Sequence, residues 1–525
     1  MRNEGLGSWP ERRLRISPGR DAIWFDGVTM SHGEFAVRVR RVAAALAELG
    51  VDRGDRVAWV SGNHPSALET LYACGQLGAI WVPVNARLTA PEAGYVLEHS
   101  GTCVVVHGGE QEALARNLRD RLPGVHTWIV ADAVDDTDGP IDGSVGSTGG
   151  SLSYEELLAA GEPAPLDVPV GLDDPCLIMY TSGTTGRPKG AVLSHGNMTW
   201  NAVNQAMGMD FTADERTLAL APLFHIGGLN GTVNPSLMRG GCAVVVRRFD
   251  PAETLRVIEE QRVTSFFAVP TMLDAMSREP GFRTRDLTSV RTVGAAGASL
   301  PLPTLRTWLA RGVTMQQAYG MTEAAPGCTV LDSADAERKV GSAGTPLFFT
   351  DVRVVRPDGT DTDVDEVGEI LVQGPNVMTG YWNDPEQTAR AIVDGWYHTG
   401  DAGSLDAEKF LYIRDRYKDM YISGGENVYP AEVESVLREL PTIAEAAVIG
   451  VPDETWGEVG VAYLVAADGA DPDPETTRVA LRQRLAGFKI PRHIQFVDEL
   501  PKTATGKIRK PDLRDRYATT TRDTT

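Results

Sequence analysis

The sequence predicts an α/β protein with more than one domain, and three observations carry that prediction. The chain has 525 residues, which at roughly 100 to 200 residues per domain is too long for one small module. Short apolar runs alternate with amphipathic helical patterns, as in βαβ units around a parallel sheet. Between residues 350 and 375 the pattern changes to short β runs. We therefore expect a large layered α/β domain with a small β-barrel-like part, followed by a smaller α+β domain.

The most clearly marked helix begins after Ser31. The run Ser-His-Gly-Glu is a capping box, in which Ser31 and Glu34 accept hydrogen bonds from each other's backbone N–H groups. Apolar side chains then recur at spacings of four and three as far as Leu49, and Gly50 ends the pattern. The remaining elements are expected in this order: a strand at 57–60, a helix at 67–77, strands at 80–84 and 104–106, a strand within 240–249, a helix from 251, a strand at 265–269, a helix near 272, β runs at 351–355 and 368–374, a helix at 431–439, strands at 446–451 and 461–466, and a helix at 476–485.

Two segments between these elements are predicted to be turns or loops. Pro357-Asp358-Gly359 joins two β runs and has the residue types of a tight turn. Residues 132–151 are acidic and rich in Gly and Ser, so they bury too little apolar surface to fold, and we expect a surface loop.

The composition excludes several classes of protein. With 71 Asp and Glu against 50 Lys and Arg, the net charge is -21, which disfavours a nucleic-acid or anionic-membrane partner. The five cysteines are scattered and have no CxxC spacing, so neither a disulfide framework nor a zinc site is indicated. The N-terminal residues contain no apolar signal region, and no run of about 18 apolar residues occurs. We expect a cytoplasmic protein without an integral membrane segment; a homodimer is compatible with the sequence but not indicated by it.

The strongest local signal is a glycine-rich stretch from Leu177 to Gly190, which reads LIMYTSGTTGRPKG. Hydroxyl residues and glycines in a tight loop present backbone amides and O–H donors together, which suits polyphosphate oxygens. A P-loop is excluded, because its pattern requires Gly at Pro188 and Ser or Thr at Gly190. A structural turn rich in Gly and Thr is the alternative.

This stretch resembles the signature loop of the adenylate-forming superfamily, and further motifs follow in that superfamily's order. Their span, from about residue 20 to residue 515, is most similar to the acyl-CoA synthetase or fatty acyl-CoA ligase branch. The motifs are Pro222-Leu-Phe-His225, Gln317-Ala-Tyr-Gly-Met-Thr-Glu323, Tyr397-His-Thr-Gly-Asp401, Arg416-Tyr-Lys-Asp-Met420, Ser423-Gly-Gly-Glu-Asn-Val-Tyr-Pro430 and Pro501-Lys-Thr-Ala-Thr-Gly-Lys507.

The resemblance implies a two-step reaction. A carboxylate attacks ATP to give acyl-AMP and pyrophosphate, and coenzyme A then displaces AMP to give acyl-CoA. It also implies an AMP-binding domain over residues 1–417 and a mobile C-terminal domain over residues 418–525 that rotates about Lys418. Two alternatives stay open: an acyl-adenylate-forming ligase that loads a carrier-protein thiol, and a degenerate nucleotide-binding relative without catalysis.

The nucleotide site implied by the resemblance is built around charge. A carboxylate and a phosphate held about 4 Å apart repel by roughly 4 kcal/mol at an effective dielectric near 20, so cations must stand between them. Lys507 matches the lysine that bridges the two, Glu323 matches the Mg²⁺ ligand, and Thr322 matches a hydroxyl donor to the α-phosphate. The positions matched to ATP and AMP binding are Thr181, Ser182, Gly183, Thr184, Thr185, Gly186, Lys189, Gly297, Ala298, Gln317, Ala318, Tyr319, Gly320, Thr322, Asp401 and Arg416.

The acid and coenzyme A sites follow from the same resemblance. Gly424 and Gly425 match the channel for the pantetheine arm. His225 matches a position beside the acyl carboxylate, and we count it as a candidate catalytic residue together with Lys507 and Thr322. The alternative for His225 is a buried core histidine bonded to backbone. Amino-acid-activating relatives carry an Asp in the stretch from Phe224 to Asn230, and this chain does not. We therefore expect a hydrophobic acid. Its candidate walls are His225, Gly228, Leu229, Asn230, Val269, Gly294, Ala295, Ala296 and Met321.

Overall fold

The computed structural model describes residues 3–132, 147–148, 150–160, 168–181, 188–297, 300–416, 419–423, 426–453, 456–485, 487–503 and 506–522. These residues form two compact units, each described here by itself. The large unit comprises Met1–Val352 and Val372–Tyr397, and the small unit comprises Arg353–Leu371 and His398–Thr525. The predicted loop at 132–151 lies almost entirely outside the described residues.

The large unit contains two nine-stranded sheets. The first has the order β17-β16-β15-β14-β13-β11-β12-β1-β2, and the second has the order β20-β10-β9-β4-β3-β5-β6-β8-β7. The strands of the first are β1 (Asp21–Phe25), β2 (Val28–Ser31), β11 (Arg216–Ala219), β12 (Cys242–Val245), β13 (Ser265–Ala268), β14 (Thr292–Ala295), β15 (Thr314–Gly320), β16 (Gly327–Val330) and β17 (Thr345–Pro346). Those of the second are β3 (Arg56–Ser61), β4 (Ile80–Asn85), β5 (Thr102–His107), β6 (Thr127–Val130), β7 (Ser147–Thr148), β8 (Ser151–Ser153), β9 (Pro175–Thr181), β10 (Lys189–Ser194) and β20 (Gly380–Tyr381).

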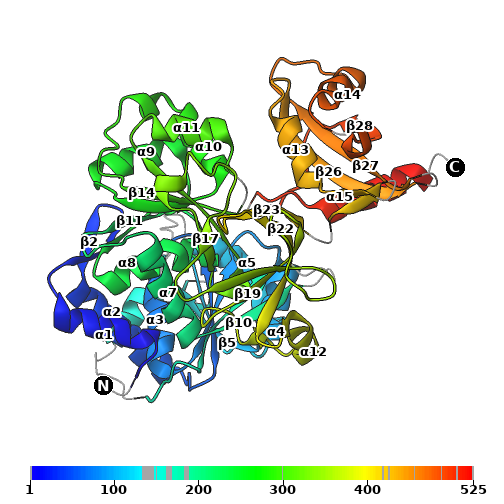
Figure 1. Ribbon diagram of the computed structural model, residues 1–525. Helices are drawn as coiled ribbons and strands as arrows, with labels where there is room; N and C mark the ends of the chain where they lie inside the picture. The colour runs from blue at the N-terminus through cyan, green and yellow to red at the C-terminus, as the bar shows by residue number, and fades with distance from the viewer. Residues whose placement is uncertain are drawn as a thin grey trace. The chain divides into compact units, whose positions relative to one another are not determined.

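Helices fill the space between the sheets and cover their outer faces. Their bounds are α1 (Trp9–Ile16), α2 (His32–Glu48), α3 (Pro65–Leu77), α4 (Ala90–Ser100), α5 (Glu112–Arg119), α6 (Tyr154–Ala160), α7 (His195–Gly208), α8 (Asn234–Arg239), α9 (Pro251–Glu260), α10 (Pro270–Arg278), α11 (Leu302–Leu309) and α12 (Pro385–Ala391). One core packs α2, α3 and α7 against both sheets. A second packs α9, α10 and α11 on the far face of the first sheet, and a third packs α4 and α5 on the far face of the second (Figure 1). The large unit is thus a five-layer α/β structure, and the predicted fold class is confirmed.

Strand alternation explains the layers. In β3, Val57 and Trp59 contribute to the central core, while Ala58 and Val60 contribute to the outer core under α4 and α5. Successive side chains of a strand point to opposite faces, so a strand covered on both sides is apolar throughout. The predicted capping box is also confirmed: the Ser31 side chain accepts from Glu34 N, and Glu34 returns a bond to the Ser31 backbone.

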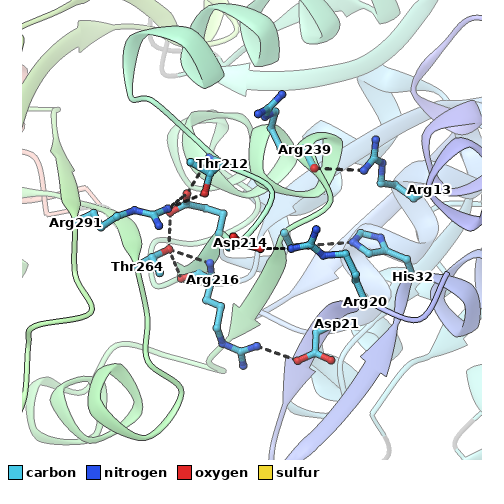
Figure 2. Close-up of polar contacts among 12 residues, drawn as sticks. Arg13, Arg20, Asp21, His32, Thr212, Asp214, Arg216, Arg239, Thr264 and Arg291 are labelled. Atoms are coloured by element: carbon cyan, nitrogen blue, oxygen red, sulfur yellow. Dashed lines mark hydrogen bonds and ion pairs between the residues drawn. The ribbon is translucent and has the colours of Figure 1, made fainter. Parts of the chain in front are cut away.

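Ion pairs stabilise the contact between the N-terminal hairpin of β1 and β2 and the other strands of the first sheet. Strand β1 pairs in parallel with β12, and Arg216 from neighbouring β11 reaches Asp21 at 2.9 Å (Figure 2). Arg20 pairs with Asp214 in the same region. Because the hairpin comes from the start of the chain, these contacts join segments almost two hundred residues apart.

The small unit contains a second kind of sheet. Its strands β24 (Tyr421–Ser423), β25 (Glu426–Val428), β26 (Ile443–Asp453) and β27 (Gly457–Ala466) are antiparallel, and β28 (His493–Phe496) adds to β27 in parallel. Helices α13 (Pro430–Arg438), α14 (Pro474–Arg482) and α15 (Lys510–Arg522) accompany it. A further five-stranded sheet takes its residues from the ranges of both units and comprises β18 (Asp351–Val355), β19 (Gly368–Gln373), β21 (Ile392–Val393), β22 (Trp396–Leu405) and β23 (Leu411–Arg416).

Short helical turns complete the described structure. They are η1 (Leu6–Ser8), η2 (Gly109–Gln111), the π-helical η3 (Gly227–Val233), η4 (Pro280–Arg283), η5 (Thr322–Ala324), η6 (Ser333–Asp335) and η7 (Gly487–Lys489). None of the helices in the described ranges combines the length and apolar character needed to cross a membrane.

Candidate active site

The carboxyl ends of four neighbouring strands bring several predicted site residues to one sheet edge. Strands β11, β13, β14 and β15 are parallel, and Ala268, Ala295 and Gln317 lie in register across the last three. The residues that follow these strand ends include the Pro222–His225 motif, Val269, and the pair Ala296 and Gly297. Ligands of open α/β sheets bind at such edges. Parallel pairing therefore gathers the predicted adenine and acyl positions, which are scattered along the sequence.

The glycine-rich loop connects two antiparallel strands of the second sheet. Thr181 at the end of β9 lies opposite Lys189 at the start of β10, while the predicted phosphate contacts Ser182, Gly183, Thr184, Thr185 and Gly186 lie outside the described residues. Lys189 Nζ donates to Gln387 Oε1 at 2.9 Å and lies 5.4 Å from the ring centroid of Tyr381. The loop thus begins with a hydroxyl and ends with an ammonium that is held by partners from the 372–397 segment.

Glu323, the predicted metal ligand, contacts Thr181 at the start of the glycine-rich loop. It follows β15 in the η5 turn and is 9% exposed. Its Oε1 accepts from Thr181 Oγ1 at 3.4 Å and from Tyr381 Oη at 3.1 Å. Burial and the nearby Glu323 charge both raise the pKa of the Tyr381 hydroxyl, so it remains a neutral donor. A carboxylate among hydroxyl groups is the oxygen set that Mg²⁺ prefers, with substrate phosphates completing its coordination.

No cluster of three or more His, Cys, Asp or Glu side chains arranged to hold a metal ion occurs among the described residues. A Mg²⁺ ion at Glu323 therefore depends on phosphate oxygens brought by the nucleotide. This donor set fits the ion, because Mg²⁺ usually binds enzymes through one or two carboxylates and the substrate's phosphates.

The predicted acyl walls differ in how much surface they present. His225, Val269, Ala296 and Met321 are partly exposed, whereas Leu229 and Ala295 are fully buried in the cores. Residues 227–233 form a π-helical segment, a local geometry that is frequent at functional sites. A side chain at Gly228 would meet the Pro222 carbonyl oxygen at 2.5 Å, and one at Gly294 would meet Met209 at 3.0 Å.

Asn230, another predicted wall, has a fully buried side chain that binds backbone. Its Nδ2 donates to Ala325 O at 2.7 Å and Met198 O at 3.2 Å, and its Oδ1 accepts from Asn234 Nδ2 at 3.2 Å. Ala325 comes two residues after Glu323, so Asn230 anchors the segment that carries the proposed metal ligand.

Two further buried asparagines, which sequence reasoning missed, hold the same segment. Asn376 Nδ2 donates to Ala324 O at 2.8 Å and Gly327 O at 2.7 Å, and Asn201 Oδ1 accepts from Gly327 N at 2.9 Å. Both side chains are fully buried. Buried polar groups must be satisfied, and a fully satisfied network specifies one geometry. The network therefore fixes the path of the chain around Glu323.

The adenine-side residues follow the same strand ends. Gln317, Ala318 and Tyr319 are partly buried in β15, and Gly320 is exposed at its end. A Cβ at Gly320 would lie 2.0 Å from Pro326 O, so only glycine fits there. Thr322 is partly exposed, Gly297 is exposed with φ +86°, and Ala298 lies outside the described residues. Ala occupies positions 296 and 318, and we expect these small side chains to narrow the predicted adenine slot without blocking it.

In the small unit, strand pairing brings Asp401 and Arg416 together. The two residues are directly opposite each other in the antiparallel pair of β22 and β23. Asp401 N donates to Thr399 Oγ1 at 3.0 Å, which fixes the backbone before the predicted ribose contact.

Lys507 lies on an exposed turn of the small unit. Its N donates to Thr503 Oγ1 at 3.1 Å, its O accepts from Thr503 N at 2.7 Å, and Gly506 between them has φ +81°. The side chain is exposed. The predicted hinge residue Lys418 and the channel residues Gly424 and Gly425 lie outside the described residues.

The chain belongs to the AMP-binding enzyme family: residues 10–382 match that family and residues 432–507 match its C-terminal domain. It is an AMP-forming acid–thiol ligase that uses ATP, Mg²⁺ and coenzyme A, and its substrates are small molecules.

Named relatives and solved structures cover nearly the whole chain. A feruloyl-CoA synthase of Amycolatopsis sp. is 47% identical over 98% of this chain and 100% of its own length. An indoleacetate–CoA ligase of Aromatoleum aromaticum is 41% identical over 98% of both chains. The o-succinylbenzoate CoA synthetase of Bacillus subtilis, solved with its acyl-adenylate intermediate, has a TM-score of 0.85 at 33% identity and covers 96% of this chain and 97% of that chain.

Proposed function

We propose that the protein is an acyl-CoA synthetase for a hydrophobic carboxylic acid, with acids that carry an aromatic ring as the favoured class. The observation that carries the proposal is the sheet edge itself, where the partly exposed apolar residues Val269, Ala296 and Met321 follow the ends of β13, β14 and β15. The named relatives act on ferulate, indoleacetate and o-succinylbenzoate, all of which contain a ring.

The first half-reaction takes place around the phosphate groups. A carboxylate oxygen of the acid attacks the α-phosphorus of ATP, the bond to the β-phosphate oxygen breaks, and pyrophosphate leaves. Lys189 and the loop hydroxyls bind the outgoing phosphates, and Thr322 donates to the α-phosphate. Mg²⁺ supplies charge neutralisation on the phosphate oxygens when it is bound at Glu323.

The remaining roles belong to the small unit and its boundary. Asp401 accepts from the ribose hydroxyls with Arg416 beside it, and Lys507 bridges the acid and the α-phosphate. In the second half-reaction a thiolate attacks the acyl carbon and AMP leaves with its phosphate. For this step we propose rotation about Lys418, with residues 418–525 as the moving domain after an AMP-binding domain of 1–417, and a pantetheine path along Gly424 and Gly425.

A panel of acids tests the proposal. Purified enzyme, ATP, Mg²⁺ and coenzyme A are incubated with short-chain, long-chain, aryl and polycyclic acids, and acyl-CoA and AMP are quantified. We expect the highest kcat/KM with a ring-bearing acid. Adenylate release without thioester on free coenzyme A would instead indicate a carrier-protein acceptor, and inactivity with every apolar acid would overturn the proposed substrate class.

A further inference from the structure

The Tyr381 hydroxyl lies among three regions to which the proposed function assigns nucleotide contacts: the Glu323 segment, the motif that begins at Tyr397, and the start of the phosphate loop. Tyr381 Oη donates to Glu323 Oε1 at 3.1 Å and is 3.3 Å from Tyr397 Oη. Tyr397 begins the motif that ends at Asp401, and Thr181 at the start of the phosphate loop shares the same Glu323 oxygen. The sequence motifs did not include Tyr381.

Strand pairing holds Tyr381 in this position. It ends β20, which pairs with β10, and Tyr381 lies opposite Ala191 two residues after Lys189. Thr388 Oγ1 accepts from Tyr381 N at 2.9 Å. These bonds hold the Tyr381 backbone, so the hydroxyl that bonds Glu323 is carried by a paired strand rather than by a loop.

The face of the same ring lies under the phosphate-loop cation. Lys189 Nζ is 5.4 Å from the Tyr381 centroid and donates to Gln387 on α12. An ammonium over an aromatic face is attracted by the ring's quadrupole. One residue thus contacts the proposed metal ligand with its edge and the proposed phosphate cation with its face.

We propose that Tyr381 is a positioning residue for the adenylation half-reaction. Its hydroxyl holds the Glu323 carboxylate in the orientation that receives Mg²⁺, and its ring sets the place of the Lys189 ammonium, so both charges are aligned before ATP binds. The inference rests on the proposed roles of Glu323 and Lys189. A purely structural tyrosine would affect stability but not the dependence of nucleotide binding on Mg²⁺.

The test substitutes Tyr381→Phe, which removes one oxygen and keeps the ring. ATP binding is measured by calorimetry without acid, so no turnover occurs, across a range of free Mg²⁺. A hydrogen bond to a charged group contributes enough to expect a rise of about tenfold in the Mg²⁺ concentration at half-saturation. Thioester formation from preformed acyl-adenylate and coenzyme A should change less than about twofold, because that step no longer involves pyrophosphate.

Tyr154→Phe is the matched control. Tyr154 begins α6, and its Oη donates to Glu69 Oε2 at 2.8 Å rather than to Glu323. The variant likewise loses a phenol hydroxyl that donates to a carboxylate, and we expect wild-type Mg²⁺ dependence. Thermal unfolding of both variants shows whether each is folded.

A double-mutant cycle completes the test. In a Glu323→Gln background the Tyr381→Phe change should no longer shift the Mg²⁺ dependence, because the carboxylate that it orients is gone. An unchanged half-saturation in Tyr381→Phe, an equal shift in Tyr154→Phe, or strictly additive effects in the cycle would overturn the inference. Failure of the proposed function appears separately, as a wild-type enzyme that binds Mg²⁺ and ATP but forms no acyl-CoA from apolar acids.

Discussion

Replacing Asn230 by Leu tests whether the buried asparagine network holds the segment around Glu323. The Asn230 side chain is fully buried, and it satisfies Ala325 O and the Nδ2 of Asn234. Leu is branched like Asn but somewhat larger, and it can neither donate nor accept a hydrogen bond. The variant therefore leaves one carbonyl and one amide group buried without these partners.

The expected loss follows from those two groups. Each unsatisfied buried group costs about 1 to 3 kcal/mol, and burial of the larger apolar side chain offsets about 1.5 kcal/mol. We expect the free energy of unfolding to fall by about 3 kcal/mol. Asn230→Asp should destabilise more as pH rises, because a protonated carboxyl can still donate to Ala325 O and an ionised one cannot.

Urea unfolding followed by tryptophan fluorescence measures this loss in the large unit, because nine of the ten tryptophans lie within its ranges and only Trp456 lies outside them. Pyrophosphate exchange is measured on the same samples below the unfolding transition, where we expect at least a tenfold decrease. A variant that matches the wild type in both stability and exchange would refute the claim that Asn230 fixes the Glu323 segment.

Three further predictions concern other parts of the chain. Lys507→Ala should abolish pyrophosphate exchange while sparing thioester formation from preformed acyl-adenylate; equal loss of both half-reactions would contradict its role. Burial lowers the pKa of His195 to about 4, so the unfolded state binds an extra proton between pH 6.5 and 4. This ring should therefore make the protein about 2 kcal/mol less stable at pH 5 than at pH 7. His195→Gln should remove this difference from the profile of urea-derived stability against pH. A Cβ at Gly7 would lie 2.1 Å from the Gly75 backbone, whereas one at Gly19 would meet nothing within 4 Å; Gly7→Ala should therefore lower Tm by several degrees and Gly19→Ala should not, as read by differential scanning calorimetry.

Local sequence patterns predicted helices and strands such as α2 and β3, because these elements depend on residues that are close together in the chain. The capping box at Ser31 and the apolar spacing that follows depend on residues within a few turns of one another, and α2 begins and continues as they require. The run Val57–Val60 is apolar on both faces, and β3 is covered on both faces.

The arrangement around Glu323 could not be predicted in the same way. Asn230 binds a carbonyl 95 residues away, and Asn376 binds one 52 residues away. An asparagine in a sequence is ordinarily a turn or surface residue, and its burial depends on which carbonyl the fold brings to it. Sequence reasoning placed Asn230 at the acyl pocket by its position near His225, but it had no signal for Asn201 or Asn376. For Tyr381 the signal was its place in Gly-Tyr-Trp directly before an Asn-Asp-Pro turn, which marks a short strand without indicating its partner.

The proposed catalytic residues fall into two physical classes, and the difference bears on how one protein performs two reactions. Glu323 is buried and its segment is held by three fully buried asparagines, so moving it would require breaking several satisfied hydrogen bonds. Lys507 is exposed, on a turn where its backbone N–H and carbonyl both bond to Thr503. A carboxylate that receives Mg²⁺ benefits from the first environment, because preorganised charge costs nothing to reorganise. A group that must leave before the thiol arrives requires the second, and this is the physical reason to assign Lys507 to adenylation only.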